Sequence, residues 1–436
     1  MDQDKQDKKE VFVIEGLAGK KTLSGEIAVG GAKNAILKVI AAAPLFKDEY
    51  TLTNVPGIED VHRAVEVLED LGAKVEIRSP GTYFVEINGL SSSVLTPEIA
   101  KRMRASLVFT GPLLARFGQV SFPHPGGCVI GKRPIDIFLE GYEAMGATVS
   151  LVDNTYTVTA KGGKLKGAEI FFRVQSVTAT ETFMMAAVLA EGKTILKNCA
   201  LEPETVSLGE FLVECGAKIT GLGTSTIEIE GGELLSGAGK TYTTVPDRIE
   251  AGSFIVLGAL CASDLKVTGC EPKHLDALLH MLKEARVNFE VGPDYVRVKN
   301  TGVEKFRAVD VKTHEYPGFP TDLQAPMGIF LTQAEGESFI FETIFEGRLG
   351  YLETFNAMGA ETRLLDAHTA MVKGPTPLKD RELESPDLRA GLAYILAALV
   401  AEGTSTIHNI YFIDRGYEKI DERLEKLGAK IKRVRE

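Results

Sequence analysis

The 436-residue chain contains no tryptophan, and aromatic residues make up only 7% of it. Positive charge is also scarce, because 49 Lys and Arg residues stand against 60 Asp and Glu residues and leave a formal net charge of −11. This balance argues against a nucleic-acid-binding protein or one that acts on a membrane surface. It does not exclude an anionic small-molecule substrate, because a local cationic site fits within an acidic protein.

The sequence also lacks a disulfide framework, a metal-ligand pattern and a membrane-length apolar run. Its five cysteines are odd in number and scattered, which is typical of a reducing compartment. The histidines show no ligand spacing with acids or cysteines, so we expect no metal and no other cofactor. The longest apolar run, residues 390–401, is too short to span a bilayer, and the charged first ten residues lack a signal-peptide core. We therefore expect a soluble cytoplasmic protein.

What the sequence does contain is an internal repeat of about 70 residues. The motif LGAKVEI returns as MGATVSL, CGAKITG, ARVNFEV, MGAETRL and LGAKIKR. Its second residue stands at positions 72, 146, 216, 286, 359 and 428, so the spacings are 74, 70, 70, 73 and 69 residues. Each copy follows a helix-like pattern, such as residues 59–70, and begins a strand. The glycine at the second position predicts a left-handed residue that ends the helix.

Six such units in one chain favour two lobes of three units each. We expect a first lobe over residues 33–245 and a second lobe over residues 1–32 plus 246–436, with the crossing inside residues 230–250. Each unit reads roughly as strand, helix, strand, helix, strand. A cleft between two lobes is a common place for a small-molecule site.

Two glycine-rich stretches predict different structures. SGAGKT at residues 236–241 looks like a phosphate loop, but Leu234 stands where that motif needs a glycine, and the following TYTTV reads as a strand. By contrast, a strand-like segment at residues 26–29 runs through a Gly-Gly pair into a helix whose first turn holds Lys33 and Asn34. Helix starts attract anions, and a lysine there opposes the helix dipole. Lys33 is therefore either an anion ligand or an ordinary solvated lysine.

Two further helix starts show the spacing of a capping box. Thr178 and Glu181 form one, and Thr321 and Gln324 form the other, with Asp322 in the first turn. Capping alone explains both patterns, and an acid in a first turn is ordinary helix design. Asp322 is therefore either such an acid or a catalytic base.

The stretch PHPGGCVIGKRPID, residues 124–137, places Cys128 on a loop, because its Pro and Gly residues disfavour a helix or strand interior. Lys132 and Arg133 follow the thiol, and nearby cations make a thiol reactive. Arginines also occur near several loop-to-helix starts: Arg104, Arg133, Arg348, Arg389 and Arg415. Singly, each is more often a solvated charge, whereas in one cleft they would bind a small, highly charged anion.

The motifs GGAKNA, RMRAS, PGGCVIGKRPID, VPDRIEAGSF, FPTDLQA, FEGR and DRGYEKI occur in this order along almost the whole chain. Together they resemble the UDP-N-acetylglucosamine 1-carboxyvinyltransferases, a family of enolpyruvyl transferases. The resemblance implies an α/β fold with two lobes, an inside-out α/β barrel of six βαβαββ repeats with three in each lobe. It also implies that the N-terminal strand joins the second lobe.

The resemblance implies a reaction as well. In it, the enolpyruvyl group of phosphoenolpyruvate is transferred to the 3-hydroxyl of UDP-N-acetylglucosamine by addition and elimination, and phosphate is released. This is the first committed step of peptidoglycan synthesis, which serves cell-wall growth, cell shape and division, and it is the target of fosfomycin. The two substrates are the expected partners, with no nucleic acid, membrane or cofactor.

The matching motifs imply residue roles. Cys128 is the acid that protonates phosphoenolpyruvate, Asp322 is the candidate base, and Lys33 is the third catalytic residue. The residues implied for phosphoenolpyruvate are Lys33, Asn34, Arg133, Arg348 and Arg415. The residues implied for UDP-N-acetylglucosamine are Arg104, Arg133, Pro134, Ile135, Asp136, Arg173, Ser176, Val177, Asp322 and Ile344.

The UDP side departs from the family pattern at three places. Phe138 stands where the family often has His, Thr178 stands where it usually has Gly, and the basic residue before that loop is displaced to Arg173. One alternative is an enolpyruvyl transferase for another nucleotide sugar or a shikimate-type acceptor, although the sister family that acts on shikimate 3-phosphate lacks a Cys loop like this one. Another is a catalytically dead relative that senses a sugar nucleotide, against which the retained Cys128 and Asp322 argue.

Overall fold

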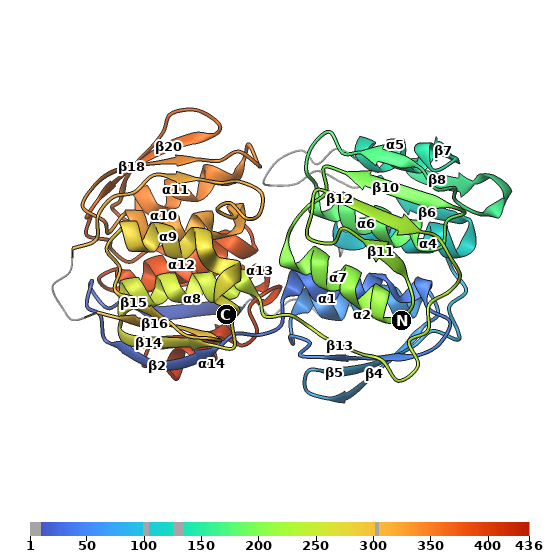
Figure 1. Ribbon diagram of the computed structural model, residues 1–436. Helices are drawn as coiled ribbons and strands as arrows, with labels where there is room; N and C mark the ends of the chain where they lie inside the picture. Colours follow the sequence, from blue (N-terminus) through green and yellow to red (C-terminus); the bar gives the residue numbers. More distant parts are fainter. Residues whose placement is uncertain (1–9, 99–103, 125–134, 301–304, 436) are drawn as a thin grey trace. The chain divides into compact units, whose positions relative to one another are not determined.

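The computed structural model describes residues 10–98, 104–124, 135–300 and 305–435. The chain divides into two compact units (Figure 1). Within the described ranges, unit 1 holds residues 10–30, 246–300 and 305–435, and unit 2 holds residues 31–98, 104–124 and 135–245.

Unit 2 alternates helices with short strands. Its helices are α1 (Lys33–Ala41), η1 (Ala43–Leu45), α2 (Glu59–Asp70), η2 (Arg104–Phe109), α4 (Thr110–Phe117), α5 (Asp136–Ala144), η3 (Lys161–Gly163), α6 (Val177–Ala187) and α7 (Pro203–Glu214). Its strands are β3 (Tyr50–Thr53), β4 (Lys74–Ser79), β5 (Thr82–Glu86), β6 (Gln119–Pro123), β7 (Ala147–Val152), β8 (Thr155–Ala160), β9 (Glu169–Phe171), β10 (Lys193–Lys197), β11 (Lys218–Thr220), β12 (Thr226–Glu230) and β13 (Thr241–Thr243).

Unit 1 has the same alternation. Its helices are α8 (Arg248–Cys261), η4 (Pro272–Leu275), α9 (Asp276–Glu284), η5 (Thr321–Leu323), α10 (Gln324–Leu331), η6 (Arg348–Gly350), α11 (Tyr351–Ala357), α12 (Leu388–Val400), α13 (Tyr411–Asp414) and α14 (Ile420–Glu425). Its strands are β1 (Glu10–Glu15), β2 (Leu23–Ala28), β14 (Ala262–Thr268), β15 (Phe289–Val291), β16 (Tyr295–Lys299), β17 (Val311–Lys312), β18 (Gly336–Phe341), β19 (Glu361–Leu364), β20 (Thr369–Gly374), β21 (Glu382–Glu384), β22 (Thr404–His408) and β23 (Lys430–Arg435).

The strands form one small sheet for each sequence repeat. Sheet β17-β18-β20-β19 is representative, because β17 pairs in parallel with β18 and the other two pairs are antiparallel. With α10 and α11 between the strands, this unit has the order βαβαββ. The described strands form six separate sheets, which confirms the predicted sixfold repeat. Their hydrogen bonds do not close a barrel, so the barrel in the predicted fold is not a hydrogen-bonded one.

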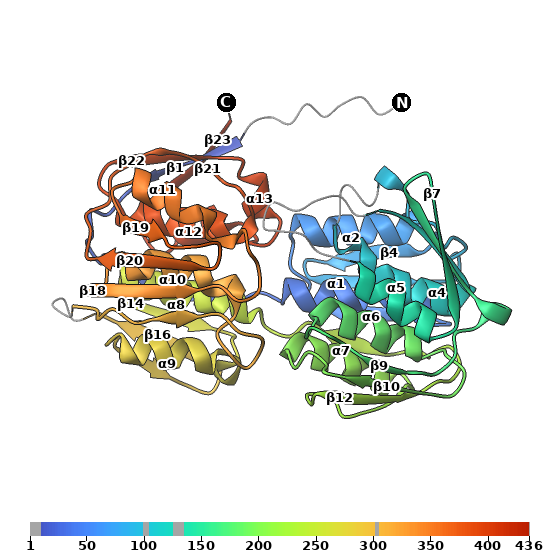
Figure 2. The ribbon, with the colours of Figure 1, turned by 90° about the horizontal axis from the view of Figure 1, so that it is seen from above.

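Three sheets take a strand from a distant part of the chain. N-terminal β1 lies between β22 and β23, as Figure 2 shows, and pairs antiparallel with both. Strand β2 pairs in parallel with β14, and β13 pairs in parallel with β3. The expectation that the N-terminal strand joins the second lobe is therefore confirmed.

The helix ends follow the repeat. Gly72, Gly146, Gly216, Gly359 and Gly428 all have positive φ, between 83° and 111°. The worn copy keeps the same conformation with a side chain, since Arg286 has φ 66°. A positive φ is easy for glycine and costly for other L-residues, which is why the repeat retains glycine at this place.

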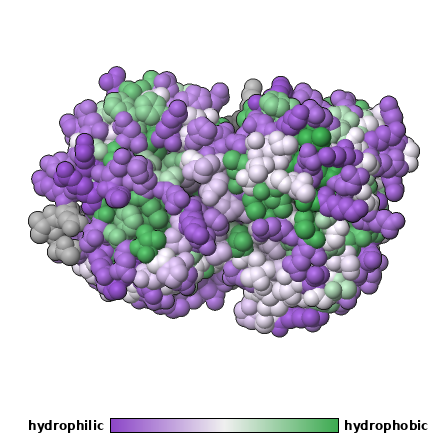
Figure 3. All heavy atoms as spheres, viewed as in Figure 1, coloured by the Kyte–Doolittle hydropathy of each residue, from purple (hydrophilic) through white to green (hydrophobic). Residues whose placement is uncertain are grey.

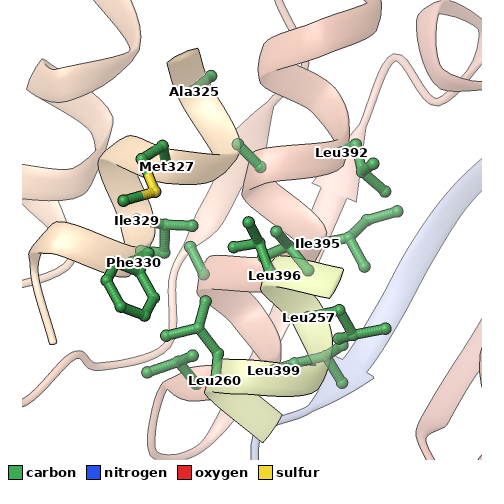
Figure 4. Close-up of a cluster of buried hydrophobic side chains, with 14 of the residues drawn as sticks. Leu257, Leu260, Ala325, Met327, Ile329, Phe330, Leu392, Ile395, Leu396 and Leu399 are labelled. Atoms are coloured by element: carbon green, nitrogen blue, oxygen red, sulfur yellow. The ribbon is translucent and has the colours of Figure 1, made fainter. Parts of the chain in front are cut away.

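Helices fill the interior of unit 1. All residues of α8 and α12 are buried, and both pack against α10, whose eight residues are also buried. Figure 4 shows Leu257 and Leu260 of α8 facing the apolar side chains of α10 and α12. A helix that is apolar on all sides belongs in a core. The apolar run at residues 390–401 therefore forms a core helix.

The surface is mixed in character. Figure 3 shows hydrophilic side chains over much of the viewed face, with smaller apolar areas among them. Within the described ranges, no helix combines the length and the apolar character that crossing a bilayer requires.

Candidate active site

The start of α1 places Lys33 and Asn34 in a tightly packed turn. Ala32, the residue before the helix, donates its N–H to the carbonyl of Val245 at 2.7 Å. The preceding Gly31 cannot be replaced without a shift, because a Cβ there would lie 2.0 Å from the Asn54 carbonyl oxygen. Lys33 Nζ forms an ion pair with Asp60 Oδ2 of α2 at 3.2 Å, and the two side chains are 14% and 8% exposed. Lys33 is thus a held, mostly buried cation, which differs from an ordinary solvated lysine.

Arg173, on the segment between β9 and α6, contacts α5. Its Nη2 donates to Asp136 Oδ2 at 2.7 Å and to Glu140 Oε1 at 3.3 Å. The hydrogen bond from Arg173 is the main reason that the pKa of Asp136 is lowered, and the same bond raises the pKa of Arg173. The Arg173 side chain is 60% exposed. Two residues that the family resemblance implies for the sugar nucleotide are therefore in contact.

Ser176 caps α6, where we expected Thr178. The Ser176 hydroxyl accepts the N–H of Ala179 at 3.3 Å, and Val177 is the first helical residue. Glu181 does not complete a capping box, because it is fully buried and forms an ion pair with Lys38 of α1. The predicted box of Thr178 and Glu181 is wrong because a tertiary partner takes the glutamate.

In unit 1, two arginines hold Asp322. Arg348 Nη2 donates to Asp322 Oδ1 at 2.8 Å, and Arg389 lies on Oδ2 with Nε at 3.0 Å and Nη2 at 2.9 Å. The carboxylate is 25% exposed, whereas the arginine side chains are 8% and 6% exposed. Both guanidinium groups stabilise the ionised carboxylate, which is the form that accepts a proton.

Arg389 is fixed from behind as well. Its Nη1 donates to the Tyr417 hydroxyl at 3.1 Å. Burial acts to lower the pKa of Arg389, but the negative charges of Asp322 and Asp247 oppose burial, and the net direction is upward. Arg389 therefore stays charged beside Asp322.

Glu342 ties η5 to the segment after β18. Its Oε2 accepts from the Thr321 hydroxyl at 2.8 Å and from Gln324 Nε2. Its Oε1 accepts the N–H of Ile344 at 2.8 Å. Thr321 and Gln324 were expected to cap a helix together, and that is wrong, because Glu342 binds both of them. The consequence is a fixed turn around Asp322 and a fixed backbone at Ile344.

The remaining predicted residues are placed as follows. Arg415 follows α13 and is half-buried, and Ile135 is buried immediately before α5. Arg104 begins η2. Cys128, Arg133 and Pro134 lie outside the described residues.

Phe138 belongs to the core of unit 2. It is 6% exposed, and its ring stacks on Phe183 of α6 with centroids 6.3 Å apart. The phenylalanine that stands in place of the family's usual histidine therefore packs on the buried side of α5. Thr178, in the first turn of α6, is half-buried.

Sequence reasoning left several residues out of the site. Arg389 was counted among the arginines at helix starts but not assigned a contact. Asp60, Lys38 and Glu342 had no signal in the sequence, because their roles depend on partners 27, 143 and 18 residues away along the chain. Among the described residues, no group of three or more His, Cys, Asp or Glu side chains is arranged to hold a metal ion.

Comparisons with known proteins define the class. The family model described as EPSP synthase (3-phosphoshikimate 1-carboxyvinyltransferase) matches residues 17–424. The enolpyruvyl transferase NikO from Streptomyces tendae has a similar structure, with TM-score 0.87, 25% sequence identity and coverage of 98% of this chain and 99% of that one. EPSP synthase from Acinetobacter baumannii shares the fold at TM-score 0.72, with 19% identity and coverage of 98% and 100%. The chain therefore belongs to the enolpyruvyl transferase family, and it is a transferase.

Curated relatives narrow the class further. The UDP-N-acetylglucosamine 1-carboxyvinyltransferase of Desulforapulum autotrophicum is 42% identical over 96% of this chain and 99% of its own length. The protein of the same name from Koribacter versatilis is 44% identical over 98% and 96%. The resemblance to this branch that the sequence motifs indicated is confirmed.

Proposed function

We propose that this chain transfers the enolpyruvyl group of phosphoenolpyruvate to the 3-hydroxyl of UDP-N-acetylglucosamine and releases inorganic phosphate. The observation that carries the proposal is identity of 42–44% along nearly the whole chain to proteins of that name. Two features of the structure support it. Lys33 is a mostly buried cation, which suits an anionic substrate, and Asp322 is a carboxylate paired with Arg348 and Arg389, which suits a base. The product places the enzyme at the entry to peptidoglycan synthesis.

The reaction requires two proton transfers and charge stabilisation. The sugar 3-oxygen forms a bond to C2 of phosphoenolpyruvate while C3 gains a proton, which gives a tetrahedral phospho-ketal. Loss of a proton from C3 and cleavage of the bond from C2 to the phosphate oxygen then give the enol ether and phosphate. Cys128 supplies the proton to C3, and Asp322 takes the proton of the 3-hydroxyl.

The remaining residues bind the substrates. Lys33, Asn34, Arg133, Arg348 and Arg415 bind the phosphate and carboxylate of phosphoenolpyruvate. The contacts to UDP-N-acetylglucosamine come from Arg104, Arg133, Pro134, Ile135, Asp136, Arg173, Ser176, Val177, Asp322 and Ile344. Four free, buried cysteines among the described residues support a cytoplasmic setting for the enzyme.

The test is phosphate release on mixing both substrates, with the product identified by mass spectrometry. We expect Asp322→Asn to lower kcat by about 100-fold or more, because general base catalysis contributes on that order. Asp264→Asn is the matched control, because Asp264 also accepts Nε and Nη2 of one arginine, Arg297, but at the surface. It should leave kcat unchanged.

Shikimate 3-phosphate serves as the competing acceptor. Turnover with shikimate 3-phosphate and none with UDP-N-acetylglucosamine would overturn the proposal. Binding of UDP-N-acetylglucosamine without phosphate release would identify a non-catalytic relative.

A further inference from the structure

Unit 2 contains a buried ion pair between two helices, just beyond the first turn of each. Lys38, on α1, is 7% exposed, and its Nζ lies 3.1 Å from Oε2 of Glu181, which is fully buried on α6. The same Nζ donates to the backbone carbonyl of Asn34 at 2.7 Å. One ammonium group thus contacts both the first turn of α1 and the carboxylate of α6. Figure 1 shows the two helices within the same unit.

The carboxylate is held from a third side. Glu181 Oε1 accepts the hydroxyl of Thr205, on α7, at 3.2 Å. The charged or titratable groups that act on Glu181 are Lys38 from α1, Glu202 and Glu204 from the start of α7, and Tyr242 from the segment at β13. Three helices of unit 2 therefore meet at this carboxylate.

Stability alone does not account for this arrangement. Glu202 and Glu204 are 8% and 3% exposed, so two further buried acids act on the carboxylate that pairs with Lys38. Burial raises the pKa of Glu181 to about 7, the neighbouring acids add to the effect, and Lys38 opposes it. An apolar pair of similar volume is often as stabilising as a buried ion pair, or more so. What this ion pair adds is a contact between two particular atoms, Lys38 Nζ and Glu181 Oε2.

This contact connects the first turn of α1 to a residue one turn beyond the start of α6, and the proposed function assigns these two helix starts to different substrates. Asn34 and the neighbouring Lys33 serve phosphoenolpyruvate, whereas Ser176 and Val177, one turn before Glu181, serve the sugar nucleotide. We propose that Lys38 and Glu181 are positioning residues that fix the phosphoenolpyruvate turn of α1 relative to the sugar-nucleotide turn of α6. This inference rests on the proposed function and adds two residues that touch neither substrate.

The test separates positioning from folding. We expect Lys38→Met to lower kcat by about 10- to 100-fold, since misplacement by about 1 Å can cost that much. The Kd of UDP-N-acetylglucosamine alone should stay within about threefold, because each turn still binds its own ligand. Lys197→Met is the matched control, because Lys197 forms an exposed ion pair with Glu169 at 2.6 Å in the same unit. That variant should keep the wild-type kcat.

A second variant covers the case in which Lys38→Met unfolds. The double variant Lys38→Met/Glu181→Gln leaves no unpaired lysine or glutamate charge at this contact, so its thermal unfolding midpoint should exceed that of Lys38→Met. We expect its kcat to remain low. Two results would overturn this inference and leave the proposed function intact. One is a kcat of Lys38→Met within twofold of wild type, and the other is a double variant that recovers both the thermal unfolding midpoint and kcat. A wild type that releases no phosphate from the two substrates would overturn the proposed function, and the inference with it.

Discussion

Four cysteines of this chain are chemically quiet because of where they lie. Cys199, Cys215, Cys261 and Cys270 are free and buried. Burial raises their pKa values to about 11, 12, 12 and 11 in that order. The thiolate is the reactive form, and at neutral pH such thiols contain almost none of it. We therefore propose Cys128, the fifth cysteine of the sequence, as the site of covalent chemistry at neutral pH.

We expect fosfomycin, an epoxide that resembles phosphoenolpyruvate, to add once to the native protein, on Cys128. Mass spectrometry of peptides from the treated protein locates the adduct. Cys128→Ala should take up no label under the same conditions. An adduct on any of the four buried cysteines would contradict this assignment.

Arg173 occupies the start of α5 through its bonds to Asp136 and Glu140. A diphosphate that binds at the start of α6 must either accept a hydrogen bond from Arg173 together with Asp136 and Glu140, or replace these two carboxylates as its partner. Since charge-assisted hydrogen bonds are the stronger ones, we expect Arg173→Ala to raise the Kd of UDP-N-acetylglucosamine about tenfold. The dependence of the rate on phosphoenolpyruvate should be nearly unchanged.

The control for Arg173 is Lys193→Ala, because Lys193 is also an exposed cation of unit 2 paired with a glutamate. Calorimetry measures both affinities. If Arg173→Ala binds the sugar nucleotide within twofold of wild type, Arg173 is a surface charge, and an alternative acceptor becomes the better hypothesis.

Residue types at this site were predictable from the sequence, whereas side-chain partners were not. Lys33 and Asp322 stood out by their positions in helix starts, but nothing local indicated Asp60 or Arg389 as their partners. The two capping boxes failed for the same reason. A Thr-x-x-Glu or Thr-x-x-Gln spacing describes a local possibility, and in both cases a distant side chain contacts the predicted capping residues instead.

At the scale of the element, the helix-ending glycines allow a matched pair of tests. Gly216 has φ 111° and nothing within 4 Å of a built Cβ, so Gly216→Ala meets only backbone strain. Arg286 occupies the equivalent place with φ 66°. A left-handed residue other than glycine costs about 1–2 kcal/mol, partly offset by the flexibility that glycine adds to the unfolded chain.

We therefore expect Gly216→Ala to lower the free energy of unfolding by about 1 kcal/mol, and Arg286→Gly to raise it by about 0.5–1 kcal/mol. Urea unfolding measures both. Gly72→Ala should cost more than Gly216→Ala, because its Cβ would lie 2.3 Å from the Gly89 carbonyl oxygen. Equal losses at the two glycines would show that the close approach is relieved at little cost.

Element boundaries near the repeat were predictable because they depend on local chemistry. The helix-like pattern at residues 59–70 coincides with α2. The strand predicted for TYTTV, after the SGAGKT stretch, contains β13. Helix periodicity and a glycine stop act over a few residues, and a sequence records such short-range constraints directly.

At the scale of the whole molecule, the sequence predicted the number of repeats but not most of their strand exchange. Strand β2 pairs with β14, more than two hundred residues later, and β13 returns to β3. The position of β1 was expected only from the family resemblance. Such pairings join segments that are far apart in the sequence, so no local pattern records them. Their register is therefore a property of the assembled units.

The buried carboxylate of Glu181 makes the stability of the molecule depend on pH. Burial raises its pKa from the ordinary 4.5 to about 7. The folded protein therefore binds more protons than the unfolded chain between these two values. The free energy of unfolding consequently falls as pH rises through that window, by at most about 1.4 kcal/mol per pH unit for one proton.

We expect Glu181→Gln to lose this dependence. The free energy of unfolding of both proteins is measured in urea from about pH 4.5 to about pH 8. The difference, variant minus wild type, should increase with pH up to about pH 7 and stay constant above it. The exchange of the protonated acid for an amide shifts the whole curve but not its slope, because the effect of Lys38 is already contained in the pKa of Glu181. Glu228→Gln, at an exposed glutamate paired with Lys193, should follow the wild type throughout. A Glu181→Gln curve parallel to the wild type across the window would mean that Glu181 is ionised in the folded protein throughout it, held so by Lys38 against the effect of burial.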